Sequence, residues 1–508
     1  MSFVRRLPSH LPLISALALA SLAMPAGAAD DTPAAVAEKQ LLPEISSTAA
    51  DQEVRRADAG LARRPDERRP EEGHTFELFG QSMRFSGEHE VTHQTRRNFD
   101  LDHHRARDRA RLDQELKLEL SFAPAADTSV FLQLVGLSEI DTWRESGDEE
   151  SFGAVERGQM WVFFAQPGGL PLDVQAGRIG LIESRSWWWD DDLDAIRLLF
   201  GDSRWLLETG VSRQLMPVST DEEGIDPERE DLARWFGRAA WLWRKRHNLE
   251  LYWLLARDRS GRPGVGRIVR EERADAVDGD VGWYGVRAIG EERSGGHRFG
   301  YWVDAARLTG REWRTGFDDV TSKLVRITDQ RRPRVDASAW DVGVRWSLPG
   351  RARPTAWLGW ASGSGDGNPD DGVDHTFRQT GLQENKGRFG GVKRFRYYGE
   401  LLRPELANLT VGSLGLSLRF LDHSSVDLVL HDYRQRRASD RLIDTRLDRD
   451  PTGQSRDLGR EIDLFFAFRE SERIEFTASL AAFRAGRAFG ADKGEVAHFL
   501  EVGMTVNF

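Results

Sequence analysis

In the last ten residues, "FLEVGMTVNF" (499–508), apolar and polar side chains alternate from Leu500 to the end. The apolar residues occupy the even positions from Leu500 to Phe508, and polar or small residues from Glu501 to Asn507 lie between them. Successive side chains of a β-strand point to opposite faces, so this spacing predicts a strand with one apolar and one polar face. A soluble sandwich and a membrane barrel both contain such strands.

The same alternation recurs from about residue 74 onward, in segments of about ten residues separated by Gly, Pro and Asp. No helical stripe of comparable length interrupts it, and a soluble protein of this size would need a second core. The apolar faces carry aromatic residues near the strand ends, as the two interfaces of a bilayer favour. Further examples are "RLDQELKLELSF" (111–122), "DVGVRWSL" (341–348) and "GREIDLFFAFR" (459–469).

A transmembrane β-barrel accommodates these segments best. After the N-terminal 28 residues, no stretch approaches the ~18 consecutive apolar residues that a membrane-spanning helix requires. A bilayer otherwise admits only closed barrels, because unpaired backbone groups are costly in hydrocarbon. We therefore expect an all-β, antiparallel barrel over 74–508.

The number of strands follows from the length of the repeating unit. A membrane strand with its share of turn and loop takes about 22–27 residues, which gives about 18 strands with a range of 16–20. A barrel of this size encloses an aqueous channel. We expect short periplasmic turns and long external loops, the latter at about 217–231, 258–280, 361–392 and 432–459.

The N-terminus predicts export. Arg5 and Arg6 precede a short apolar segment and an A-x-A cleavage site, so we expect a signal peptide at 1–28. Residues 29–73 are rich in Ala, Pro and charge and are expected to form a flexible periplasmic lead-in. The sequence has no cysteine, which excludes disulfides, thiol catalysis and a lipoprotein anchor. The expected location is the outer membrane of a Gram-negative cell.

If the apolar faces meet lipid, the opposite faces line the lumen, and strand parity assigns charges of both signs to it. Such arginines could form a ladder of ion pairs that braces the wall, or remain without acidic partners at a constriction and attract an anionic solute. The sequence leaves both readings open. The arginines placed inward are Arg234, Arg238, Arg345, Arg394, Arg396 and Arg419, and the acids are Glu115, Glu119, Asp304, Asp341, Glu400 and Glu461.

Three tryptophans stand directly before three aspartates in "WWWDDD" (187–192). Indole prefers the lipid–water interface, whereas carboxylates prefer water or a polar lumen. The juxtaposition predicts a position at the rim of the barrel, with the tryptophans at the lipid interface.

Three segments resemble the outer-membrane alginate export porins: "GRIGLIESRSWWWDDDLDAIRL" (177–198), "GSGDGNPDDGVDHTFRQTGLQENKGRFGG" (363–391) and "FRYYGELLRPELANL" (395–409). The likeness covers about residues 80–500. It implies a monomeric barrel of 18 strands whose narrow, arginine-rich throat conducts a polyuronate during secretion. It also implies contact with outer-membrane lipid and periplasmic secretion partners.

By this resemblance, Arg178 and Arg197 occupy positions where the family places pore arginines, and Arg378 and Arg388 fall in the second segment. A general anion-preferring diffusion porin and an uptake channel for acidic oligosaccharides remain alternatives. The expected pore residues are Arg178, Arg197, Arg345, Arg378, Arg388, Arg394, Arg396 and Arg419.

Other functions receive less support from the residues. His423 beside Ser424 and Ser425 is the nearest approach to a catalytic set, but neighbours on a strand point opposite ways, so we expect no enzyme. The net charge of −11 argues against nucleic-acid binding. No cofactor or metal is expected, except that Asp366, Asp370 and Asp371 could bind calcium in an external loop whose default state is solvated.

Overall fold

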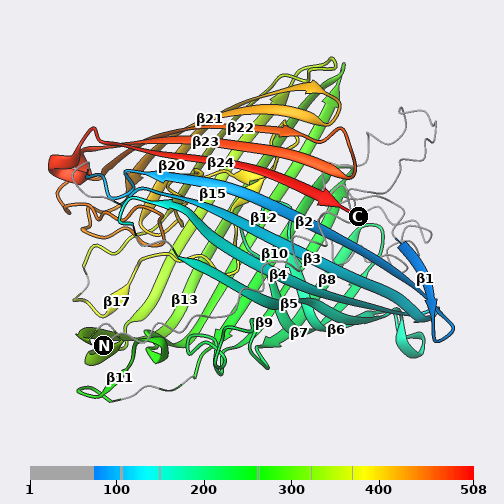
Figure 1. Cartoon of the computed structure of the whole chain (residues 1–508), viewed down its shortest axis with the longest axis horizontal. Coiled ribbons are helices and arrows are strands. Elements are labelled where there is room, and N and C mark those ends of the chain that lie inside the picture. The colour runs from blue at the N-terminus through cyan, green and yellow to red at the C-terminus, as the bar shows by residue number, and fades with distance from the viewer. Residues whose placement is uncertain are drawn as a thin grey trace.

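A computed structural model describes residues 74–102, 107–147, 150–259, 261, 264–321, 323–368 and 370–508. The expected signal peptide and lead-in lie outside these residues. The described chain forms a closed antiparallel barrel of eighteen strands (Figure 1), as the sequence predicts. Within the described residues, no helix is long and apolar enough to cross a membrane.

The barrel wall follows the chain from strand to neighbouring strand, and β24 pairs with β2 to close it. Closure leaves the sheet with no first or last strand, as a bilayer requires. The wall strands are β2 (Gln81–Arg97), β3 (Arg109–Ala125), β4 (Thr128–Arg144), β5 (Ser151–Phe164), β6 (Asp173–Ile182), β7 (Asp190–Gly201), β8 (Trp205–Arg213), β9 (Ala233–Arg244), β10 (His247–Arg257), β12 (Val277–Ser294), β13 (His297–Thr321), β15 (Arg334–Ser347), β16 (Thr355–Gly363), β20 (Leu409–Leu421), β21 (Ser424–Gln435), β22 (Asp457–Phe468), β23 (Ile474–Ala485) and β24 (Val496–Asn507).

The shorter elements decorate the two ends of the barrel or lie within it. β1 precedes β2 and pairs with it, β11 pairs with β14, and β18 pairs with β19. Their bounds are β1 (His74–Leu78), β11 (Ile268–Arg270), β14 (Leu324–Arg331), β17 (Val373–Asp374), β18 (Lys386–Gly387), β19 (Phe395–Arg396), η2 (Pro167–Gly169), η3 (Glu271–Arg273) and η4 (Arg487–Asp492).

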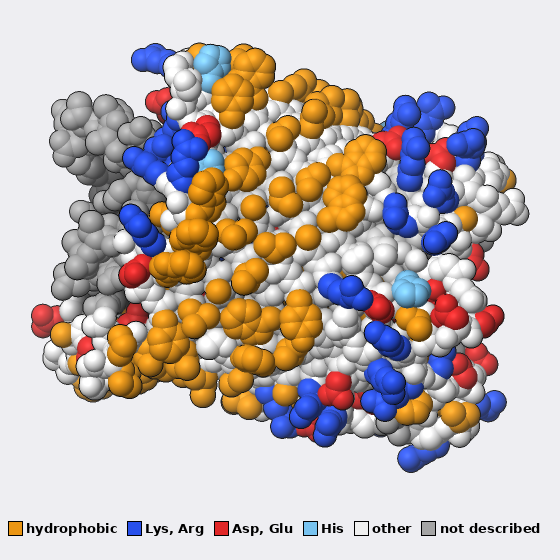
Figure 2. Space-filling view, turned by 180° about the vertical axis from the view of Figure 1, so that it is seen from behind, with side chains coloured by type: hydrophobic (Ala, Val, Ile, Leu, Met, Phe, Trp, Pro, Cys, Tyr) orange, Lys and Arg blue, Asp and Glu red, His pale blue; other side chains and the backbone are white. Residues whose placement is uncertain are grey.

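The two faces of the wall differ as the alternation predicts. In β24 the even-numbered Leu500 and Val502 are exposed, whereas Ala497 and Phe499 point inward and are buried. Figure 2 shows apolar side chains as a broad band across the barrel, with charged side chains gathered towards its rims. This band is the surface that the hydrocarbon of the membrane covers.

The connections at the two ends differ in length. At one end neighbouring strands are joined by short turns, such as 245–246 between β9 and β10 and 295–296 between β12 and β13. At the other end the connections are long, as at 214–232 and 436–456. In outer-membrane barrels the short turns face the periplasm, so the long connections face outward.

One expected external loop is instead internal. The connection 364–408 between β16 and β20, here called the luminal loop, folds into the barrel. The loop brings Phe389, Phe395 and Leu402 into the buried core. Its polar residues hid this placement in the sequence, because its buried aromatic and leucine side chains have no regular period.

The rim position expected for the tryptophans is wrong. Trp187, Trp188 and Trp189 belong to the turn 183–189 between β6 and β7, here called the inner turn, and each is at most 2% exposed. The Trp188 ring stacks on Tyr252 of β10 with 5.0 Å between ring centroids and 5° between their planes. The tryptophans are buried because the inner turn folds into the lumen, where aromatic neighbours replace the lipid interface.

Candidate functional site

The inner turn and the luminal loop contact each other and fill one side of the lumen. Trp187 donates from Nε1 to the Tyr398 hydroxyl at 2.9 Å, and Asp190 donates its amide to the Leu382 carbonyl. The Tyr397 hydroxyl donates to the Arg185 carbonyl at 3.0 Å. These bonds join two segments about 200 positions apart in the chain into one internal plug.

Buried ion pairs fix this plug to the wall. Arg287 of β12, 1% exposed, donates to Asp304 of β13 at 2.6 Å and to Glu183 of the inner turn at 3.0 Å. Arg185 of the inner turn pairs with Asp341 of β15. Burial alone would raise the pKa of Glu183, but Arg287 and the backbone amides that bond its carboxylate outweigh burial and lower the pKa to about 2. Glu183 is therefore ionised, and Arg287 serves as its counter-ion.

The lumen beside β2–β5 is less filled. Two groups on β3 keep partial access to solvent, with the Glu115 side chain 36% and Lys117 28% exposed, whereas Glu119 on the same strand and Asp304 on β13 are buried. These two groups mark a solvent-accessible path beside β2 and β3.

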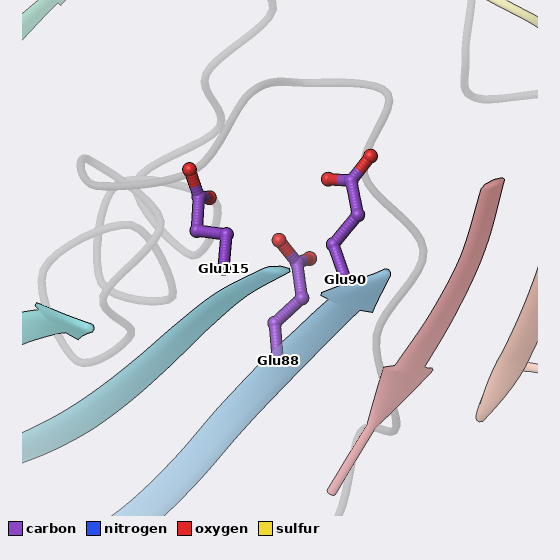
Figure 3. Close-up of side chains that lie close together, drawn as sticks. All are labelled: Glu88, Glu90 and Glu115. Carbon is purple, nitrogen blue, oxygen red and sulfur yellow. The ribbon is translucent and has the colours of Figure 1, made fainter. Parts of the chain in front are cut away.

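Three carboxylates of this path lie together in the middle of the barrel. Glu88 and Glu90 come from β2 and Glu115 from β3, and Figure 3 shows all three projecting from the same face of the sheet. One carboxylate oxygen of each lies within 4.8 Å of those of the other two. Lys117 pairs with Glu115 at 2.6 Å and with Glu88 at 3.0 Å, so one ammonium group partly neutralises the acidic row.

An arginine cluster lies towards the external end, here called the external arginine pocket. Arg396, Arg403 and Arg446 line a cavity of about 290 Å³ together with Glu405 and Asp444. The Arg446 guanidinium donates to the Glu400 carbonyl at 3.3 Å and to Gln94 at 3.2 Å. Burial, and then the charges of neighbouring arginines, lower the pKa of Arg446. The other two arginines have acidic partners, Glu400 for Arg403 and Glu384 for Arg396.

A second cluster, the periplasmic arginine pocket, lies at the short-turn end. It has a volume of about 230 Å³, and Glu291 is the single acidic residue among its described lining residues. Arg345 pairs with Glu291 at 2.7 Å, whereas Arg419 donates to the carbonyls of Gly390 and Gly391 in the luminal loop. The arginines of this pocket are Arg298, Arg345, Arg353 and Arg419.

Comparison with known proteins decides the family. The family described as "Alginate export" matches residues 79–503, which is nearly the whole barrel. The chain belongs to the alginate export family. Membership together with the barrel fold makes it an outer-membrane channel for alginate export rather than an enzyme, and confirms the resemblance drawn from the sequence.

Relatives and solved structures agree with this assignment. The alginate production protein AlgE of Pseudomonas aeruginosa is 27% identical over 367 residues, covering 68% of this chain and 71% of AlgE. The AlgE of Azotobacter vinelandii is 27% identical over 263 residues, covering 50% and 52%. The Pseudomonas aeruginosa structures OccK5 and OccK8 have TM-scores of 0.50 and 0.51 at 11% and 9% identity, each covering 84% of this chain and 98% of its own; they show the fold alone.

Two predicted pore arginines of this alginate export barrel are held by the wall. Arg197 on β7 is 7% exposed, bonds Gln175 at 3.0 Å and pairs with Glu208 at 2.9 Å. Arg378 of the luminal loop pairs with Glu312 of β13 and with Asp374. Both act as braces of the barrel in this arrangement.

The predicted arginines of the luminal loop lie inside the barrel, but strand parity did not place them. Arg394 donates to Ser186 at 2.7 Å, and Arg396 pairs with Glu384. Arg388 lies near enough to Arg419 for their charges to repel. The parity argument was wrong for Arg394 because it lies in the loop and not on a wall strand; for Arg396, β19 is a two-residue strand within that loop.

Arg178 differs from the other seven predicted pore arginines in where its side chain lies. On β6 the fully buried Gln175 and Ile179 share one face, so Arg178 projects from the opposite face. At the bend where β6 leaves β5, Arg178 lines a hollow with the exposed Ile196 and Val211, and it also lies beside Asp191 and Leu382.

Sequence reasoning missed the arginines that complete the two pockets. Arg298 stands beside a turn, and Arg403 and Arg446 lie in loops, where no two-residue period assigns a face. The arrangement "YGELLRPEL" (398–406) carries the only available signal, an arginine among buried leucines.

The calcium site stays a prediction. Asp366 and Asp371 accept hydrogen bonds from the backbone amides of Asn368 and Val373 at 3.0 and 2.9 Å. These bonds shape the turn and use one oxygen of each carboxylate.

Proposed function

We propose that this channel conducts an alginate-like polyuronate along β2–β5, from the periplasmic arginine pocket to the external one. The observation that carries the proposal is the gathering of arginines near both ends of the barrel. The lining arginines number four in the periplasmic pocket and three in the external one, where Arg396 and Arg403 also pair with Glu384 and Glu400. An extended polymer with about one carboxylate per sugar can occupy both pockets at once.

The strength of each contact suits transport. An ion pair exposed to water contributes about 0–1 kcal/mol, so several of them hold a chain without trapping it. The acidic row of Glu88, Glu90 and Glu115 lies on β2 and β3, across the barrel from the strands that line the periplasmic pocket, and repels the same polymer. Alternating attraction and repulsion lowers the depth of any single binding site, which favours sliding.

Current blockade in planar bilayers tests the proposal. Polymannuronate is expected to block the open channel, and the double substitution Arg403→Ala with Arg446→Ala is expected to weaken the blockade by up to about thirtyfold, since two ion pairs with the polymer, each contributing up to about 1 kcal/mol, are lost. Arg434→Ala is the matched control, because Arg434 lies at the external end of β21 with its side chain 67% exposed beside the outward-facing Asp432.

A second polymer separates the alternatives. Neutral dextran of the same length is expected to block weakly, because it has no carboxylates to pair with arginine. Equal blockade by dextran and polymannuronate, or equal blockade of the double variant and the native protein, would favour the general diffusion porin. Blockade that grows only when polymannuronate is added from the external side would favour an uptake channel.

The external pocket also predicts a dependence on pH. Burial raises the pKa of Glu405 to about 7, and the nearby Asp444 adds to the effect. A carboxyl with a raised pKa is neutral below that value and gains its charge as the pH rises through it. We expect polymannuronate blockade to weaken as the pH rises from about 6 to about 8, because the Glu405 carboxylate gains a negative charge that repels the polymer. Glu405→Gln is expected to remove most of this pH dependence. An unchanged pH profile in Glu405→Gln would contradict this assignment.

A further inference from the structure

The barrel wall is bent inward at its external half between β5 and β8. Pairing of β5 with β6 stops at Met160 and Arg178, and pairing of β7 with β8 begins only at Ala195 and Ser212. Beyond these positions the β6–β7 hairpin leaves the wall and carries the inner turn into the lumen.

A loop segment closes the resulting gap. Residues 215–220, which follow β8, cross to the free edge of β5, where Arg157 donates its amide to Val218 at 2.9 Å and Thr220 donates to Val155 at 3.0 Å. The barrel stays closed, but its outer surface is hollowed below this crossing segment.

The hollow is a groove of about 1010 Å³, here called the outer groove, which runs across the external ends of β6–β13. Glycine is required where the backbone is bent at its margins. Gly177 and Gly310 have φ of 129° and 150°, and a Cβ on either would lie 2.2 Å from a neighbouring carbonyl oxygen. The groove is lined by exposed apolar side chains on the lipid-facing parity, among them Ile196, Val211, Trp235 and Tyr284, and by Leu215 and Met216 of the crossing segment.

Positive charge gathers at the same groove. Its lining contains five arginines and two aspartates. Arg213 also pairs with Asp231, and Asp191 lies near Arg178 and Arg234, so the excess over nearby aspartates is about one positive charge. Arg157 bonds both oxygens of Asp194 at 3.0 and 2.9 Å, and Arg257 pairs with Asp280 at 3.1 Å. The Nε atom of Arg178 is buried and has no hydrogen-bond partner within the described part of the chain. The arginines are Arg157, Arg178, Arg213, Arg234 and Arg257.

We propose that the outer groove binds one phosphorylated lipid of the outer leaflet. Its apolar lining fits acyl chains, and its arginines, Arg178 above all, fit the phosphate, because guanidinium forms paired hydrogen bonds with phosphate oxygens. A polyuronate does not fit this surface, since it would face apolar side chains and hydrocarbon. The bound lipid fills the hollow left by the inward hairpin and so seals the wall where the ladder is interrupted.

Native mass spectrometry of the purified full-length protein tests this site, with diphosphorylated lipid A as the probe. One lipid is expected to bind saturably, and Arg178→Ala with Arg257→Ala is expected to reduce its affinity at least tenfold. Arg460→Ala is the matched control, because Arg460 is an exposed arginine at the external end of β22 and pairs with Asp432. The control variant is expected to bind as the native protein does.

A second variant and a lipid without phosphates provide two further tests of this binding site. Leu215→Asp places a charge in the groove from a loop position outside the wall strands, and is expected to weaken binding even if the arginine variant fails to fold. Lipid A without phosphates is expected to bind at least tenfold more weakly. Equal binding of both lipids, an equal loss in Arg460→Ala, or dimers that persist without lipid would overturn the proposal, the last in favour of an interface between copies of the chain.

Discussion

Replacing residues 380–405 of the luminal loop with a short Gly-Ser linker is expected to raise the single-channel conductance several-fold. An 18-stranded barrel with an empty lumen is an open aqueous channel, so the segment removed is the main obstacle to ions. The new ends lie close together, because the Leu406 amide donates to the Gln379 side chain at 3.4 Å.

The wall should survive this deletion. β16 pairs directly with β20 from Thr355 opposite Ser417 to Ser362 opposite Thr410, so the loop is not needed to close the barrel. The variant also loses Arg394, Arg396 and Arg403, and polymannuronate blockade should disappear with them. Planar-bilayer recordings measure both effects. A conductance equal to that of the native protein would show that the constriction lies elsewhere.

Arg287→Met is expected to lower the free energy of unfolding by about 3–5 kcal/mol, because removing one partner of a buried ion pair strands the other charges. The variant leaves Glu183 and Asp304 buried without the guanidinium that both now bond. Urea unfolding of the protein refolded into lipid vesicles measures the change. The inner turn should loosen with it, because Glu183 also accepts the amides of Arg185 and Trp188.

A matched control exists on the next strand. Arg307 of β13 is 63% exposed and pairs with Asp336 at 2.7 Å, so Arg307→Met is expected to lower the free energy of unfolding by less than about 1 kcal/mol. Adding Glu183→Gln and Asp304→Asn to Arg287→Met should recover part of the loss by removing the stranded charges. Equal destabilisation by Arg287→Met and Arg307→Met would contradict the role given to the buried network.

The periodicity of the wall strands was sufficient to predict the architecture. Leu500 and Val502 lie on the exposed apolar face of β24. An extended backbone alone places alternate side chains on one face, so this assignment needs no knowledge of distant neighbours. Repetition of the same pattern, with the length of the chain, predicted eighteen strands and a membrane location. The same parity correctly turned Arg345 and Arg419 away from the lipid-facing side, towards what is now the periplasmic arginine pocket.

The sequence by itself therefore determined the barrel, its number of strands and the two faces of the regular wall strands, but not the face of Arg178 on the bent strand β6. Only the tertiary structure decided which charges have partners, because Glu183 and Arg287 are 104 positions apart and no local pattern relates them. It also decided that Trp187–Trp189 and the luminal loop lie inside the barrel. A two-residue period describes a strand, whereas a turn or loop takes its place from whatever surface it can bury against.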